Sequence, residues 1–134
     1  MEQLERAERY LARLRTIYAG VWNEHQTTNQ HEDDLLSFFM HCYHVRDWLI
    51  HSEPRVIAKQ VDDYINKCEC LRICADICNG VKHRVLTRGT RSGMQPCLTC
   101  EEYQMSTWYT GNGGGEIVVG RYSIETAAGT VDAL

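Results

Sequence analysis

The sequence predicts a mainly α protein, a four-helix (or five-helix) bundle with a C-terminal β-hairpin. Apolar residues recur at spacings of three and four in four successive segments before residue 87, the pattern of helices that bury one face. Further on, two stretches rich in β-forming residues flank the glycine-rich run GNGGG at 111–115, which is a hairpin signal. We therefore divide the 134 residues into a helical bundle, 1–86, and a loop with a β-hairpin, 87–134, packed on the bundle.

Each predicted helix is bounded by polar residues or a helix breaker. A polar connector, 23–30, follows the first helix, and Pro54 ends the second. The predicted helices span 2–24, 32–51, 55–67 and 69–86. We expect no strand within this part of the chain.

The C-terminal part has a different character. Residues 103–110 and 116–125 are the predicted strands of the hairpin. The last six residues, GTVDAL, have the pattern of a helix that begins at Thr130, so we expect a further C-terminal helix that is cut short here.

Composition excludes some classes of function. The net charge of -4 and the pI near 5.8 argue against broad electrostatic binding to nucleic acid or to an anionic membrane. No stretch approaches the roughly 20 apolar residues of a membrane-spanning helix, so we expect no membrane contact. The charged start, MEQLERAERY, is unlike a signal peptide, and seven cysteines without such a signal indicate reduced thiols in the cytoplasm.

Arg46 is the most unusual residue of the second helix. At about 100° per residue it falls near the middle of the apolar face that contains Leu35, Phe39 and Cys42. An unpaired charge away from water is costly, so this arginine needs a partner or a function. His51 follows five residues later, near the end of the helix.

The stretch RDWLIH, from Arg46 to His51, resembles the R-x4-6-H motif of the HEPN superfamily (higher eukaryotes and prokaryotes nucleotide-binding domains). The resemblance covers the four-helix part, 1–86. HEPN proteins are helical bundles, and many are metal-independent ribonucleases of toxin–antitoxin, antiphage and CRISPR-associated systems. The resemblance implies an endoribonuclease that acts on RNA without cofactor or metal. It also implies a homodimer, with a cognate antitoxin or another protein as partner.

The resemblance makes Arg46 the phosphate clamp, His51 the base and Asp47 the residue that orients one of them. The chemistry agrees, because a guanidinium binds phosphate through two donors and histidine can take the proton of an RNA 2′-OH near neutral pH. On an uninterrupted helix, however, Arg46 and His51 point about 140° apart. They meet only if the helix loosens near Ile50, or if two protomers each supply one residue at a two-fold interface.

Asn79, Lys82 and His83, in CNGVKH, are the predicted substrate-binding residues. Asn79 and His83 share a helix face at a spacing of four, and Lys82 opens a basic run that continues to Arg91. If the fourth helix lies beside the second, these side chains add phosphate contacts. The alternative is an ordinary solvated face.

Two other functions remain open. The bundle could be a non-catalytic adaptor or assembly subunit, in which Arg46 pairs with an acid of a partner. It could also be a binding module for a nucleotide or single-stranded RNA, through the basic run 82–91. Trp48, Tyr43 and Ile50 widen the apolar surface of the second helix, which predicts a two-fold dimer along it.

The cysteines give no metal site by themselves. Cys97 and Cys100 form a single CxxC pair, whereas zinc usually needs two further ligands. Cys68, Cys70 or His83 could serve only if the fold brought them near. Cys74 and Cys78 are expected to be reduced and buried in the core.

Overall fold

The computed structural model describes residues 2–22, 28–83, 89–107 and 115–134. Its elements are α1 (Glu2–Ala19), β1 (Val21–Trp22), α2 (Thr28–Ser52), α3 (Ala58–Lys67), α4 (Glu69–His83), β2 (Cys97–Thr107), β3 (Gly115–Thr126) and β4 (Gly129–Asp132). The predicted class is confirmed: four helices precede an antiparallel hairpin. None of the described helices combines the length and apolar character that crossing a bilayer requires.

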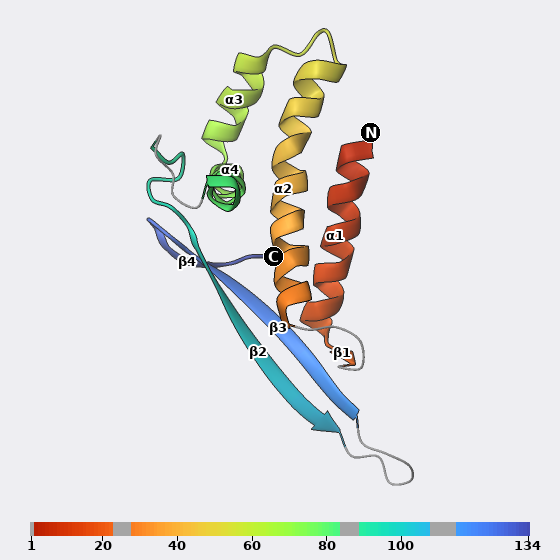
Figure 1. The fold of residues 1–134 in the computed structure, drawn as a ribbon. Coiled ribbons are helices and arrows are strands. Elements are labelled where there is room, and N and C mark those ends of the chain that lie inside the picture. Colours follow the sequence, from red (N-terminus) through yellow and green to blue (C-terminus); the bar gives the residue numbers. More distant parts are fainter. Residues whose placement is uncertain (1, 23–27, 84–88, 108–114) are drawn as a thin grey trace.

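The helices α1 and α2 lie side by side and antiparallel (Figure 1). Arg13 of α1 donates to Asp34 of α2 at 3.1 Å, and Gln3 at the other end of α1 contacts His41. The shorter α3 runs along the second half of α2, and α4 crosses the bundle, so that it is seen end-on in Figure 1. This arrangement brings the C-terminal end of α4 to the flank of α2.

One hydrophobic core joins the helices to the sheet. It is built from side chains of α1, α2, α4 and β3. Its fully buried members are Leu14, Ile17, Leu35, Phe39, Ile73, Cys74, Ile77, Tyr122 and Ile124. Because Tyr122 and Ile124 of β3 are buried among helical residues, the base of the hairpin is part of this core.

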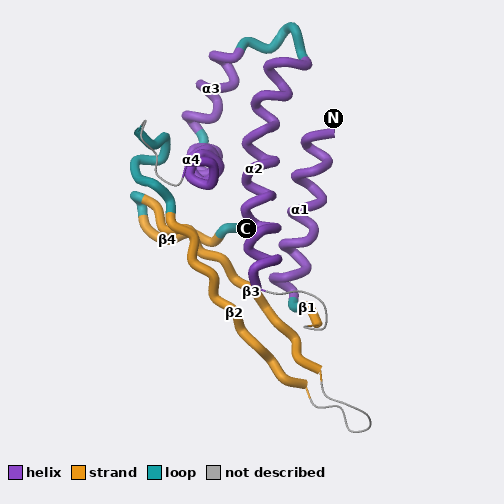
Figure 2. The backbone as a smooth tube through the Cα atoms, viewed as in Figure 1, coloured by secondary structure: helices purple, strands orange, loops and turns teal. Residues whose placement is uncertain are grey.

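The long strands β2 and β3 form the predicted hairpin and extend beyond the ends of α1 and α2 (Figure 2). They pair antiparallel from Cys97 opposite Glu125 to Thr107 opposite Gly115. The strand order is β1-β3-β2, and β4 also pairs with β3. Part of the glycine-rich loop, 111–114, falls outside the described residues.

The prediction that strands would be absent from 1–86 is wrong. Val21 and Trp22 form β1, opposite Val118 and Ile117 of β3. The first helix ends at Ala19 and not near residue 24, because Gly20 adopts a φ of 104° and leaves the helical path. A Cβ at Gly20 would lie 2.9 Å from Ile117 Cγ2, so glycine also permits the close approach to β3.

The helix predicted to begin at Thr130 is also wrong. Residues 129–132 form β4, which pairs with β3 from Thr126 opposite Gly129 to Ser123 opposite Asp132. Gly129 has a φ of 121°, and the side-chain Oγ1 of Thr126 donates to the carbonyl of Gly129 at 2.7 Å. These features turn the chain back on itself where a helix start was expected.

The other helix limits shift by a few residues. Helix α2 begins at Thr28, inside the segment predicted as a polar connector, and continues to Ser52. Helix α3 begins at Ala58, after the turn that follows Pro54. The described part of α4 ends at His83, and residues 84–86 of the predicted fourth helix lie outside the described residues.

Candidate functional site

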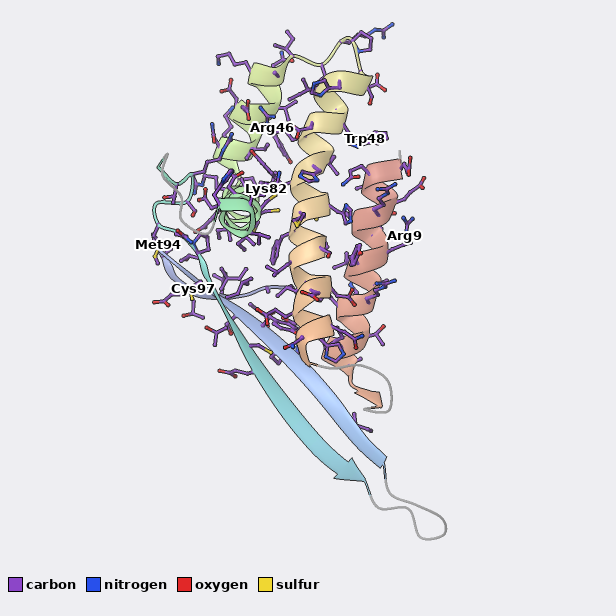
Figure 3. All side chains as sticks on the ribbon, in the orientation of Figure 1. Arg9, Arg46, Trp48, Lys82, Met94 and Cys97 are labelled. Carbon is purple, nitrogen blue, oxygen red and sulfur yellow. The ribbon has the colours of Figure 1, made fainter. Side chains whose placement is uncertain are left out.

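The guanidinium of Arg46 is hydrogen-bonded to two carboxylates of its own chain. Its Nε and Nη2 donate to Asp62 Oδ1 and Oδ2 at 2.9 and 2.8 Å, and its Nη1 donates to Asp47 Oδ1 at 2.7 Å. The hydrogen bonds from Arg46 lower the pKa of Asp62 to about 2, and those to Asp62 raise the pKa of the guanidinium above its usual value. Arg46 is therefore a paired charge that joins α2 to α3 (Figure 3).

The same carboxylate also binds the segment after α4. Arg91 Nη2 donates to Asp62 Oδ1 at 3.2 Å, and Arg91 Nη1 donates to Asn66 Oδ1 at 3.1 Å. Ile65 is the one buried residue among those of α3. Ion pairs around Asp62 thus connect α3 to α2 and to the segment after α4.

His51 does not meet Arg46 within the chain. Helix α2 is regular through Ser52, so the loosening near Ile50 that would bring the two together does not occur. His51 is exposed, and its Nδ1 lies 2.7 Å from the carbonyl oxygen of Asp47. Because a carbonyl can only accept, Nδ1 carries the proton and Nε2 of the neutral ring has a lone pair for another partner.

His51 instead shares a face of α2 with His44 and Trp48. Their spacings of four and three place the three side chains within an arc of about 60°. Trp48 is 39% exposed and lies on the side of α2 away from Arg46 (Figure 3). A shallow depression of about 290 Å³ is lined by Asp47, Trp48, His51 and Ser52.

Helix α4 contributes a cation to this face. Lys82 Nζ lies 3.2 Å from His44 Nε2. An ammonium group can only donate, so His44 Nε2 accepts and the imidazole is neutral in this arrangement. We call His44, Trp48, His51 and Lys82 the histidine face.

The other two predicted substrate-binding residues are not brought into the same contact. Asn79 is half-buried and His83 is exposed on α4. Within the described part of the chain, neither makes a hydrogen bond to α2. Of the predicted trio, Lys82 alone reaches the histidine face by such a bond.

His41 lies one turn before His44 on α2 and packs against α1. Gln3 Nε2 donates to its Nδ1 at 2.8 Å, and its ring stacks on Tyr10 with centroids 5.1 Å apart. Burial lowers the pKa of His41, and the charges of Arg6 and Arg9 on α1 lower it further. Cations of α1 and α4 thus flank the histidines of α2.

The histidine face combines three chemical capacities. Lys82 can bind an anionic oxygen, and the lone pair of His44 Nε2 beside it can accept a proton. The exposed ring of Trp48, one turn further along α2, offers a flat surface on which a nucleic-acid base can stack. These capacities match a phosphodiester with an unpaired base.

The cysteines do not form a metal site among the described residues. Cys97 and Cys100 lie three residues apart on the regular strand β2, so their side chains point to opposite faces of the sheet. Cys74 and Cys78 are buried, as predicted from the sequence. The thiol of Cys74 donates to the carbonyl of Phe39 at 3.2 Å.

Two residues of the face were not predicted as site residues. These are His44 and Trp48, although the i, i+4, i+7 spacing of His44, Trp48 and His51 puts the three side chains together on a helix. The contact between His44 and Lys82 spans 38 residues and depends on how α4 crosses α2.

Comparison with known proteins adds no relative. No protein-family model, no curated protein and no solved structure matches this chain. The geometry of the described side chains is therefore the basis for assigning a function.

Proposed function

We propose that the protein is a metal-independent endoribonuclease that acts on single-stranded RNA at the histidine face. The observation that carries this proposal is the 3.2 Å contact between Lys82 Nζ and His44 Nε2, with the exposed Trp48 one turn further along α2. The resemblance to HEPN nucleases points to the same class of reaction. The chemistry uses His44 and Lys82 in place of Arg46, because the donors of Arg46 already bind Asp62 and Asp47.

In the proposed reaction, His44 is the base. Its Nε2 takes the proton of a 2′-OH, and the 2′-oxygen attacks the adjacent phosphorus. The bond from phosphorus to the 5′-oxygen breaks, and that oxygen takes a proton from water. Lys82 turns to the phosphate and stabilises its developing charge. The products carry a 2′,3′-cyclic phosphate and a 5′-hydroxyl, and DNA is inert because it has no 2′-OH.

Trp48 and His51 serve the neighbouring nucleotide. Stacking of a base on an exposed aromatic ring is worth about 1–3 kcal/mol and needs an unpaired base, which favours single strands over duplexes. His51 lies about 10 Å from His44 along α2, too far to share its phosphate. In this proposal His51 contacts the next nucleotide through Nε2, and Asp47 holds the ring by its carbonyl oxygen.

The proposal extends to the oligomeric state, the cellular compartment and the partners of the protein. We also propose a homodimer that pairs along α2, and light scattering at micromolar concentration measures whether it forms. The proposed compartment is the reducing cytoplasm, which suits seven cysteines that are all thiols. A cognate antitoxin or other protein partner, in a defence system against phage, is proposed from the HEPN resemblance alone.

The adaptor function keeps one specific observation in its favour. An exposed tryptophan beside polar and charged side chains is typical of the anchors of protein interfaces. The interface would then be centred on Trp48 and not on Arg46, because Arg46 has its acids within the chain.

Cleavage of a labelled single-stranded RNA tests the proposal through two matched pairs of variants. Lys82→Gln removes the phosphate contact and should slow cleavage by about 10²-fold or more. Lys59→Gln is its control, because Lys59 is 81% exposed on α3 and pairs with Asp63. Trp48→Leu should weaken RNA binding, whereas Tyr64→Leu, at an aromatic residue 67% exposed on α3, should leave it unchanged.

The outcomes separate the functions. Cleavage of RNA but not of DNA, unaffected by EDTA and lost in Lys82→Gln, supports the nuclease. If the parent protein leaves RNA intact and Trp48→Leu disrupts self-association or partner capture, the nuclease is wrong and the adaptor is favoured. Circular dichroism of each variant shows whether the bundle is intact.

A further inference from the structure

A second concave site lies between α1, α2 and α4, where the chain after β4 crosses α2 (Figure 1). Its volume is about 300 Å³. It shares no lining residue with the histidine face, so it is a separate site. Ligand pockets in proteins span roughly 300–1,000 Å³, which makes this one suitable for a small ligand.

The walls of the pocket are apolar and fixed in place. Phe38 and Cys42 of α2, Leu71 of α4 and Leu134 are among its lining residues. Leu134 is held by its N–H, which donates to Asp132 Oδ1 at 3.0 Å. The neighbouring backbone is held in the same way, since residue 133 donates its N–H to the carbonyl of residue 122 at 2.9 Å.

The thiols of the pocket behave as apolar groups. Burial raises the pKa of Cys42 to about 11, and it raises that of Cys74 well above the usual value of a thiol. Both thiols are therefore neutral at physiological pH and present sulfur surface rather than charge. A ligand that enters between the helices meets aromatic, aliphatic and sulfur atoms.

Arg15 is the one charged side chain among the described residues that line the pocket. It is exposed on α1, one turn from Leu11, and it makes no ion pair within the described part of the chain. A guanidinium beside an apolar hollow complements a molecule with an apolar body and a single carboxylate, because its planar donors bind a carboxylate at two points.

We infer that the pocket binds a small apolar monocarboxylate of the medium-chain fatty acid class. The carboxylate lies on Arg15, and the hydrocarbon chain lies between Phe38 and Leu71. Burial of the chain supplies the affinity, and the ion pair with Arg15 selects the acid over the corresponding alcohol. This site is independent of the proposed nuclease activity.

Two exposed cysteines, one at the pocket and one outside it, allow ligand binding to be measured. Cys70 lines the pocket and is exposed, whereas Cys97 is exposed on β2, outside the pocket. The probe is decanoate below its micellar concentration, and the measurement is the rate at which iodoacetamide alkylates each cysteine, followed by mass spectrometry. Decanoate should slow the alkylation of Cys70 and leave that of Cys97 unchanged.

Charge and shape are tested with variants. Arg15→Gln should raise the decanoate concentration for half-protection of Cys70 roughly tenfold or more, the loss expected for a hydrogen-bonded ion pair. Arg9→Gln is the matched control on an exposed part of α1 and should have no effect. Leu71→Phe should abolish protection by filling the hollow, and Arg15→Gln keeps the test valid if that variant does not fold.

Two outcomes would overturn the inference. Unaltered alkylation of Cys70 at every submicellar concentration of decanoate would exclude binding in the pocket. Equal protection by decanol and decanoate, unchanged in Arg15→Gln, would show that Arg15 does not select a carboxylate.

Discussion

The guanidinium of Arg46 donates two parallel hydrogen bonds to the carboxylate of Asp62, sixteen residues further along the chain, at 2.9 and 2.8 Å. This pair joins α2 to α3 and occupies the donors that a phosphate clamp would use. It also makes the stability of the bundle depend on pH in acid.

The first prediction follows from the lowered pKa of Asp62, about 2 against an ordinary 3.8. A carboxyl group with a depressed pKa stabilises the fold above its unfolded pKa, and that contribution is lost as the pH falls through the folded pKa. Asp62→Asn should therefore lose stability at neutral pH and show a flatter decline between about pH 4 and pH 2. Denaturant unfolding as a function of pH measures this. Asp63→Asn, at a half-exposed position, is the control; parallel profiles for the parent and Asp62→Asn would contradict the role given to the pair.

The second prediction concerns Asp76, a buried carboxylate of α4. It accepts hydrogen bonds from the N–H of Arg91 at 2.9 Å, and from the N–H and Oγ of Ser92 at 2.7 and 2.6 Å. Asp76→Ala leaves these donors without their acceptor, at an expected cost of about 2–3 kcal/mol. Hydrogen exchange of the amides of Arg91 and Ser92 should accelerate strongly. Asp33→Ala on the exposed side of α2 should change neither the stability nor these exchange rates. Unchanged exchange in Asp76→Ala would show that Asp76 does not hold the segment of Arg91 and Ser92.

The third prediction concerns Tyr18, whose hydroxyl joins α1 to the sheet. It accepts from the N–H of Tyr122 at 3.1 Å and lies 2.9 Å from Asp132 Oδ1. Tyr18→Phe should cost about 1–2 kcal/mol, because it removes the hydroxyl that accepts from that N–H. Tyr64→Phe should cost almost nothing, since Tyr64 is 67% exposed.

The raised pKa of Tyr18 also predicts that the protein loses stability in alkali. Burial raises its pKa to about 12, from an ordinary 10.0. Its contribution is complete below pH 10 and is lost as the pH rises through 12, because the folded state holds the proton more tightly. An ultraviolet titration in which every tyrosine ionised together near pH 10 would contradict the burial of the Tyr18 hydroxyl.

The fourth prediction concerns the order in which the thiols react. Cys70 and Cys97 are exposed, whereas Cys74 and Cys78 are buried, and burial raises the pKa of both buried thiols. A thiol reagent at neutral pH should modify the exposed pair quickly and the buried pair only after unfolding. Rapid modification of Cys74 or Cys78 in the native protein would show that the core opens readily.

Local pattern was sufficient to predict most of the architecture. The spacing of Leu35 and Phe39 predicts their burial in α2, and β-forming residues around the glycine run predict the hairpin of β2 and β3. The strand β1 has two residues, too few to produce a periodic signal, and its partner lies almost a hundred residues away in β3. It forms because Gly20 ends α1 beside that strand.

The functional side chains were harder to place, because their partners lie on other elements. Periodicity correctly puts Arg46 toward the bundle, but nothing local reveals that Asp62 of α3 will neutralise it. The contact of Lys82 with His44 likewise depends on the crossing of α4 over α2. The spacing of His44, Trp48 and His51 places them on one face of α2, whereas the HEPN-like spacing pairs His51 with Arg46, on another face of the helix.

The most direct test compares the rates of RNA cleavage by His44→Asn and Arg46→Lys. The account predicts that His44→Asn loses a factor of about 10² or more, because it removes the base. Arg46→Lys should cleave at close to the parent rate, since a lysine can still pair with Asp62 and no phosphate is bound there. If Arg46→Lys loses activity while His44→Asn retains it, or if the parent protein cleaves no RNA, the central claim is wrong.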